Sequence, residues 1–300
     1  MRRPIFDPLL LVALALVGTG TADAQRVGFA DSDAVRLYYE IYGERASDEA
    51  LPVVLVAGLG SSTWLWERQV TDLAEYFVTV VFDNRGSGRS EAPAGPYSVS
   101  MMAADVASLL DAIDVERAHV VGASLGGLIA QEFALQYPDR VGRLVLISTT
   151  AGGASHESMS AETAGRFMAT HEDPEELIRI RLPLAFSEGY LSDEAVVQHL
   201  IGQRLDRPQD PAAYRAQAIA GATFDAAGRV GDIRAATLIA QATDDLLVPV
   251  ANAYRLADSI PNAALRLYDG LGHQFFVEIP DTFNRDLVAF LKGLHLVEAD

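Results

Sequence analysis

The sequence predicts an α/β fold in which helices flank a mostly parallel central sheet and a helical segment is inserted late in the chain. Three observations support this. Short apolar runs that suit buried strands alternate with helical stretches along most of the 300 residues. One such run ends in a tight, glycine-rich turn at Ser124 that leads directly into a helix. The stretch from about 152 to 229 has helical patterns and no good strand.

The first 24 residues have the three parts of a secretory signal peptide. Residues 1–3 read Met-Arg-Arg, residues 9–17 are apolar, and residues 22–24 form an Ala-Asp-Ala cleavage site. The apolar run is short for a membrane span, which needs about 20 residues. An uncleaved anchor is the alternative. We therefore expect cleavage after residue 24, export to a periplasm or the medium, and no stable membrane association afterwards.

Composition excludes several classes of function. The chain has no cysteine, so disulfides, thiolate catalysis and cysteine-ligated metals are excluded. It carries 23 basic and 41 acidic residues, a formal net charge of −18. Because such a negative field repels phosphate backbones and anionic lipid, we expect no nucleic-acid partner.

The first part of the chain reads as alternating strands and a helix. Residues 27–43 alternate in polarity and predict an antiparallel pair of edge strands. Residues 51–56 and 78–82 are apolar runs that predict inner parallel strands, with a helix over about 64–76 between them. The Gly- and Ser-rich loop 57–63 is either a plain turn or a backbone donor site beside a reaction centre.

A charged, glycine-punctuated loop, Asp-Asn-Arg-Gly-Ser-Gly-Arg-Ser, follows at residues 83–90. It lacks the lysine of a phosphate-binding loop, and no helix opens on its glycines. We expect Asp83 and Arg85 to hold this loop by a local ion pair. Ser98 is expected to cap the helix that continues to about Ile113.

The rest of the chain predicts two parts of one sheet around the helical segment. We divide the mature chain into a first core part at 25–151, a helical cap at 152–231 and a second core part at 232–300. Prolines at positions 174, 183, 208 and 211 are expected to break the cap helices. The expected core elements are strands at 144–147, 236–240 and 264–268 and helices at 252–259 and 280–292.

Ser124 stands at the corner between a strand ending near residue 123 and a helix beginning near residue 125. A serine at such a turn has strained backbone geometry, which small neighbours such as Gly122 and Gly126 permit. The turn would lift its hydroxyl to a helix N-terminus, where the free N–H of Leu125 can stabilise an oxyanion. The pattern therefore indicates a nucleophile.

A serine hydroxyl needs a base to take its proton and an acid to orient that base. His273 follows the last predicted strand in a Gly-Leu-Gly-His loop, and Asp244 and Asp245 follow the strand at 236–240. Loops at the carboxyl ends of parallel strands converge on one crevice. We therefore expect Ser124 as nucleophile, His273 as base and one of the two aspartates as the acid.

Four motifs together resemble the α/β-hydrolase superfamily over residues 27–291: GASLGG around Ser124, the loop at 83–90, DLLVP after the acid and GLGH at the histidine. In that family the acid stands four residues before the proline, which implies Asp245. The family's oxyanion hole maps onto the backbone N–H groups of Leu59 and Leu125. Ala57 and Ala123 stand where many relatives carry histidine, so this chain departs from the family pattern at two positions that affect loop support and substrate shape.

The resemblance implies a serine hydrolase that cleaves a small carboxylic ester or lactone through an acyl-enzyme on Ser124, with no metal or organic cofactor. The signal peptide predicted in residues 1–24 adds the expectation that this hydrolase is exported. The sequence of these motifs is most similar to enol-lactonases and small methylesterases. Enol-lactonase substrates are anionic, which suits arginines of the cap such as Arg179 and Arg181. Serine at the turn argues against haloalkane dehalogenases and epoxide hydrolases. The alternatives are an acyltransferase or haloperoxidase-like perhydrolase with the same triad, and a ligand-binding receptor with a relic triad.

Overall fold

A computed structural model describes residues 26–33, 35–44 and 50–295, and the signal peptide expected at residues 1–24 lies outside that range. Eight strands form a single sheet in the order β1-β2-β4-β3-β5-β6-β7-β8. All pairs from β4 to β8 are parallel, and β1 and β2 are antiparallel to their neighbours. The strands are β1 (Arg26–Ser32), β2 (Val35–Tyr42), β3 (Val53–Val56), β4 (Thr79–Phe82), β5 (Ala118–Ala123), β6 (Val141–Ile147), β7 (Ala236–Ala242) and β8 (Ala263–Tyr268).

Helices connect the strands, as expected of right-handed crossovers in a parallel sheet. Among the described residues none of them is both long and apolar enough to cross a membrane. The α-helices are α1 (Glu67–Ala74), α2 (Val99–Ala112), α3 (Leu125–Gln136), α4 (Ala161–Phe167), α5 (Pro174–Ala185), α6 (Glu188–Leu191), α7 (Glu194–Asp206), α8 (Pro211–Ala222), α9 (Ala251–Ser259), α10 (Phe275–Glu278) and α11 (Pro280–Leu291). Short 3₁₀ turns are η1 (Thr63–Trp66), η2 (Pro138–Arg140) and η3 (Val230–Asp232).

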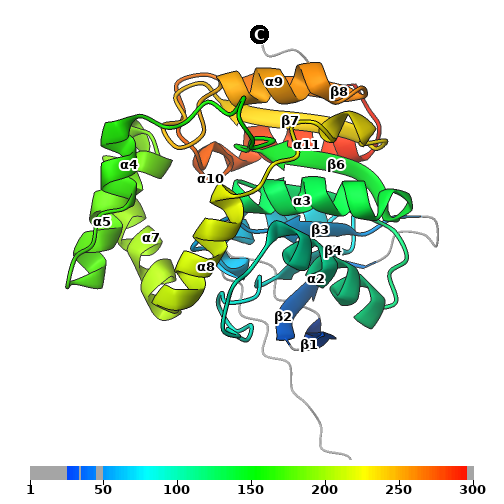
Figure 1. Ribbon diagram of the computed structural model, residues 1–300, viewed down its shortest axis with the longest axis horizontal. Coiled ribbons are helices and arrows are strands. Elements are labelled where there is room, and N and C mark those ends of the chain that lie inside the picture. The colour runs from blue at the N-terminus through cyan, green and yellow to red at the C-terminus, as the bar shows by residue number, and fades with distance from the viewer. Residues whose placement is uncertain (1–25, 34, 45–49, 296–300) are drawn as a thin grey trace, which may run out of the picture.

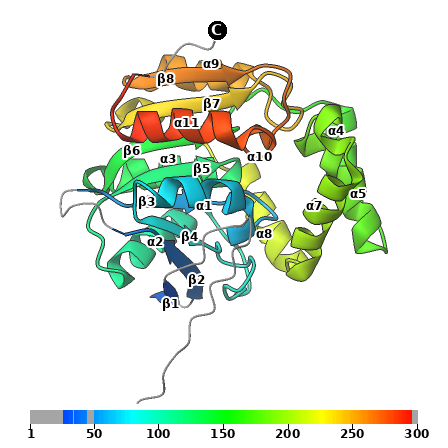
Figure 2. The same cartoon turned by 180° about the vertical axis from the view of Figure 1, so that it is seen from behind.

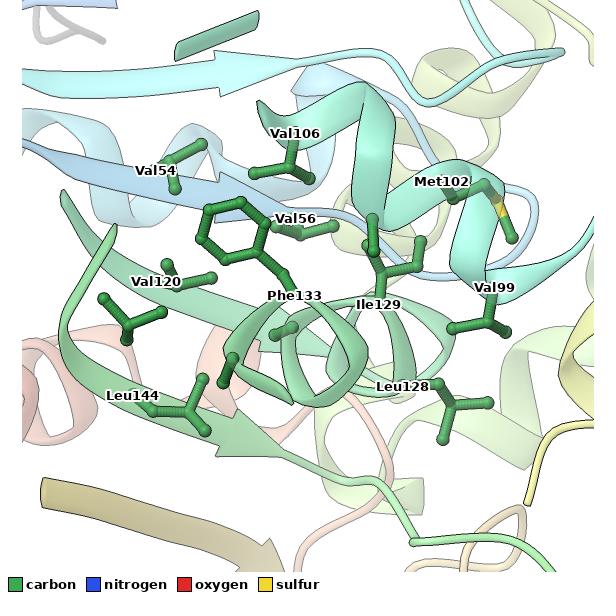
Figure 3. Close-up of a cluster of buried hydrophobic side chains, with 14 of the residues drawn as sticks. Val54, Val56, Val99, Met102, Val106, Val120, Leu128, Ile129, Phe133 and Leu144 are labelled. Carbon is green, nitrogen blue, oxygen red and sulfur yellow. The ribbon is translucent and has the colours of Figure 1, made fainter. Parts of the chain in front are cut away.

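The sheet has an apolar core on each face. Helices α2, α3 and α9 cover one face, which is seen in Figure 1, and α1 and α11 cover the other, which is seen in Figure 2. Figure 3 shows Ile129 and Phe133 of α3 among side chains from the sheet and α2, including Val120 and Met102. Because strands β3 to β6 are buried on both faces, their sequences are nearly continuous apolar runs.

The predicted α/β fold with a mostly parallel sheet is confirmed, and the expected strands are present with ends that differ by a few residues. The Ser98 side chain accepts a hydrogen bond from the N–H of Met101, which confirms the predicted helix cap. The N-terminal antiparallel pair is also present. However, of these two strands β1 lies at the edge of the sheet and β2 does not, because β2 pairs with β4 on its other side.

Helices α4 to α8 fall between β6 and β7 and lie to one side of the sheet (Figures 1 and 2). Pro174 and Pro211 occupy first-turn positions behind the capping side chains of Asp173 and Asp210. The expected break at Pro183 is wrong, because this proline lies inside α5. The boundaries at 151/152 and 231/232 stay predictions.

The expected ion pair between Asp83 and Arg85 is wrong. Arg85 forms a bidentate pair with buried Asp105 of α2, with both N–O distances at 2.6 Å. The Asp83 carboxylate instead accepts 2.7 Å hydrogen bonds from the backbone N–H groups of Thr63 and Arg89. Its partners are therefore backbone donors, one of which belongs to the loop after β3.

Candidate active site

Ser124 lies at a strained turn between β5 and α3, with φ 55° and ψ −119°. A positive φ is costly for a residue with a side chain, so the surroundings must enforce it. Its N–H donates to the carbonyl of Ile147 at 2.9 Å, and its carbonyl accepts from Thr149 Oγ1 at 2.8 Å. At Gly126 a Cβ would lie 2.0 Å from the Val56 carbonyl oxygen, so only glycine fits there.

Asp245 and His273 form a buried pair across the loops after β7 and β8. The distance from His273 Nδ1 to Asp245 Oδ2 is 2.7 Å, and each residue is 5% exposed. Asp245 Oδ1 also accepts backbone hydrogen bonds from Leu247 and Val248, both at 2.9 Å. Asp244, the other aspartate considered, is exposed, and within the described part of the chain its side chain bonds only its neighbour Thr243.

The histidine loop and the serine turn meet at the end of β6. Ser124 bonds the backbone of Ile147, and the next residue, Ser148, donates its hydroxyl to the His273 carbonyl at 2.8 Å. In the described part of the chain the Ser124 hydroxyl itself makes no hydrogen bond, to His273 or to another group. Such contacts in free hydrolases commonly tighten only when substrate binds.

The loop after β3 passes directly against Ser124. A Cβ at Gly58 would lie 3.2 Å from the Ser124 Cβ, and the preceding Ala57 carbonyl accepts from Asn84 Nδ2 at 2.9 Å. Within the described chain no hydrogen bond uses the N–H of Leu59 or Leu125 as its donor. The 83–90 loop thus supports the 57–63 loop, and two unengaged backbone donors lie on segments that adjoin the serine.

The family model described as the alpha/beta hydrolase fold matches residues 52–280, which span these loops and most of the sheet. The chain belongs to the α/β-hydrolase family. RutD of Azorhizobium caulinodans, named a carbamate hydrolase, is 33% identical over 255 residues, covering 85% of this chain and 94% of RutD. RutD of a Caulobacter species is 34% identical over 265 residues, covering 86% and 96% of the two chains.

Solved structures of hydrolases superpose on most of this chain. The enol-lactonase from Burkholderia xenovorans has a TM-score of 0.78 at 28% identity, covering 88% of this chain and 100% of the lactonase. Est816, described as an N-acyl homoserine lactone degrading enzyme, has a TM-score of 0.75 at 31% identity, with the same shares covered. These hydrolases support the family and the coarse function of this chain as a hydrolase.

Sequence reasoning missed Gln241, which bonds Asp245, the candidate acid. Gln241 lies on β7, is fully buried, and its Nε2 donates to Asp245 Oδ2 at 2.9 Å. The same amide group bonds the carbonyl of Val248 at 3.1 Å, so it holds the strand end and the acid loop together. The available signal was a polar residue at the end of an apolar strand, four residues before Asp245.

One cavity of the described chain has neither the serine nor the histidine in its wall. It has a volume of about 340 Å³ and lies between α1, α6, α7 and α10, with Trp64, Tyr190, His199 and Gln274 in its wall. Glu67 in the same wall contacts His199 at 3.1 Å, a histidine–acid pair that sequence reasoning missed. The His199–Glu67 pair is solvent-accessible, and no serine lies in the wall of this cavity. We therefore locate the candidate site by the Asp245–His273 pair.

The two cap arginines that were expected to suit anionic substrates have different partners in the structure. Arg179 is paired with Glu175 at 3.0 Å and with Glu194 at 3.1 Å at the surface, so its charge is already neutralised. Arg181 instead donates to the Ala169 carbonyl and lies over the ring of Tyr214. Only the second therefore lacks an acidic partner among the described residues.

Proposed function

We propose that this α/β hydrolase cleaves a small carboxylic ester or lactone through an acyl-enzyme on Ser124. The observation that carries the proposal is the buried 2.7 Å contact between Asp245 and His273, beside a serine held at positive φ. This is the arrangement that a serine nucleophile requires, because the acid orients the imidazole and stabilises its protonated form. Ala57 and Ala123 do not weaken it, since the expected oxyanion donors are backbone groups.

The proposed reaction has two steps. The Ser124 oxygen attacks the substrate carbonyl while His273 takes the hydroxyl proton, and the N–H groups of Leu59 and Leu125 stabilise the oxyanion. Collapse breaks the ester C–O bond, and His273 returns the proton to the leaving alcohol or, in a lactone, to the ring oxygen. Water, deprotonated by His273, then attacks the acyl-enzyme and regenerates the serine. The chemistry needs no metal or organic cofactor.

A fluorophosphonate probe and a panel of p-nitrophenyl esters test this proposal. Wild-type protein should be labelled and should turn the esters over, while Ser124→Ala should lose both activities and keep its circular dichroism spectrum. Single-turnover release without further cycles would favour a receptor with a relic triad. Turnover that passes the acyl group to added alcohol or peroxide in preference to water would favour acyl transfer or perhydrolysis.

A carbamate is the second candidate substrate. It is supported by the RutD proteins of Azorhizobium and Caulobacter, which are named carbamate hydrolases and match most of this chain. The same serine, histidine and oxyanion donors would act on a carbamate carbonyl. Matched p-nitrophenyl acetate and p-nitrophenyl N-methylcarbamate distinguish the two, because a carbamate hydrolase turns the second over many times rather than stopping after one cycle.

We also propose that the protein is exported. The support is the order of charge, apolar run and small-residue cleavage site in residues 1–24. Expression of the full chain followed by N-terminal sequencing tests it. Mature protein beginning at Gln25 in the periplasm or medium supports export, and an intact N-terminus in the cytoplasm contradicts it.

A further inference from the structure

Glu278, the last residue of α10, bonds two segments that are far apart in the sequence. Its Oε1 accepts a 3.2 Å hydrogen bond from the N–H of Gly272, the residue before His273. The same oxygen accepts from the Ser187 N–H at 3.1 Å, and Oε2 accepts from the Ser187 hydroxyl. One carboxylate therefore joins the histidine loop to residues 185–187, the α5–α6 turn. Helix α10 lies on the side of the core that faces α4 and α5 (Figures 1 and 2).

A second contact joins the α5–α6 turn to the other side of His273. The N–H of Gln274 donates to the Ala185 carbonyl at 2.8 Å. The two backbones are so close here that a Cβ at Gly272 would lie 2.8 Å from the Ala185 oxygen and 3.0 Å from the Phe186 carbonyl carbon. The turn thus holds the backbone both before and after the proposed base.

The backbone position of His273 decides where its reactive nitrogen lies. The imidazole is bonded at Nδ1 by Asp245 at 2.7 Å, and the His273 carbonyl accepts from Ser148 Oγ at 2.8 Å. The Ser124 proton must reach the other ring nitrogen, Nε2. A contact at Nδ1 alone leaves the ring free to swing about that atom. Displacement of a reacting group by about 1 Å can cost a hundredfold in rate, so the remaining backbone contacts matter.

We propose that Glu278 is a positioning residue for His273, and that it acts through the reach of its carboxylate to the α5–α6 turn. This inference rests on the proposed function. The three hydrogen bonds of Glu278 come from two backbone N–H groups and a hydroxyl, all of them uncharged. Side-chain length and acceptor atoms are therefore required here, and the negative charge is not.

Loss of this carboxylate should release the histidine loop without unfolding the protein. Helix α10 is anchored separately, because Phe275 and Phe276 are buried in the apolar core. Glu278 itself is only half-buried, so its hydrogen bonds contribute modestly to the free energy of unfolding. The effect of a substitution is therefore expected in the rate of the reaction.

Three substitutions separate reach from charge. Glu278→Gln keeps the length and an oxygen that can accept from both N–H groups, but loses the charge. Glu278→Asp keeps the charge, but is one methylene too short to reach both segments. Glu278→Met keeps the approximate length and has no oxygen acceptor. Hydrolysis of p-nitrophenyl acetate is measured for each, and kcat is divided by the number of sites that a fluorophosphonate labels at completion. Misfolded protein lowers the number of sites, whereas a displaced base lowers the rate per site.

Glu278→Met and Glu278→Asp should lower kcat per site about tenfold to a hundredfold with little change in KM. Glu278→Gln should stay within about threefold of the wild type. Ser187→Ala should cause a smaller loss, because the Ser187 N–H remains, and should cause no further loss in the Glu278→Met background. The control is Glu188→Met, since Glu188 is the next residue and is exposed. This variant should keep the wild-type kcat and KM.

The outcomes separate this inference from the proposed function. A wild-type kcat per site in Glu278→Met, or a loss confined to the number of labelled sites, would overturn the inference and leave the proposed function intact. Should Glu278→Met not fold, Glu278→Asp against Glu278→Gln decides. Equal rates per site in those two would overturn the inference, because the length of the side chain would then have no effect. No Ser124-dependent turnover of any ester would overturn the proposed function, and this inference with it.

Discussion

Gln241 Nε2 and Asp245 Oδ2 are 2.9 Å apart, and that same oxygen accepts a hydrogen bond from His273 Nδ1 at 2.7 Å. One carboxylate oxygen thus serves both a buried amide and the imidazole. The amide shares the negative charge that would otherwise act on the imidazole alone, and it prevents the carboxylate from rotating. Gln241 is therefore a positioning residue for the proposed base.

Gln241→Met should lower kcat about 10- to 100-fold with little effect on KM, the range measured for partners that orient functional side chains. Steady-state ester hydrolysis measures kcat and KM separately. A loss that appears in KM and not in kcat would contradict the positioning role, and Gln136→Met, near the surface of α3, is the control.

Asp245→Asn should reduce turnover on the order of 10⁴-fold, because an amide cannot hold the required tautomer or stabilise the imidazolium. Asp244→Asn should change turnover less than about threefold, since Asp244 is exposed and does not contact His273. Steady-state assays of the two variants compare neighbouring aspartates directly. The opposite ranking would transfer the role of the acid to Asp244.

Gly126→Ala should destabilise the fold by about 3 kcal/mol or more, because the added methyl meets backbone of β3 that cannot move aside. The matched control is Gly165→Ala. Gly165 is exposed in α4 with no atom within 4 Å of an added Cβ. That variant should be stabilised by about 0.5–1 kcal/mol through helix propensity. Urea unfolding measures both, and equal effects would contradict the close approach of α3 to β3.

Burial, with Arg143 and Arg117 nearby, lowers the pKa of His119 to about 4. The folded protein therefore keeps this histidine neutral at pH values where the unfolded chain, with an ordinary pKa of about 6.5, takes up a proton. The free energy of unfolding should fall as pH drops from about 6.5 towards 4, by at most about 3 kcal/mol from this residue. Urea unfolding at pH 7.5, 6 and 5 follows the change.

His119→Gln removes the titrating group, so its stability should depend less steeply on pH over that window than that of the wild type. His171→Gln is the control, since His171 is exposed. Parallel pH curves for wild type and His119→Gln would show that His119 is not the source of the dependence.

Much of the fold could be predicted because its signals are local. The apolar runs of β3 to β6 and the helical spacing of α2 and α3 depend on near neighbours in sequence, and the structure reproduces them. The interior proline of α5 and the partner of Arg85 could not be predicted. Whether Pro183 ends or continues α5 depends on the residues that pack around that helix. The partner of Arg85 is Asp105, which reaches Arg85 only when α2 packs on the sheet.

The sequence by itself determined the α/β fold, the strand–turn–helix at Ser124 and the order of serine, acid and histidine along the chain. These follow from residue type and spacing, which act over a few positions. Tertiary structure decided which aspartate meets His273 and that Gln241 bonds the same carboxylate. Such contacts join distant segments, and their physical consequences come from burial, which sequence spacing does not specify.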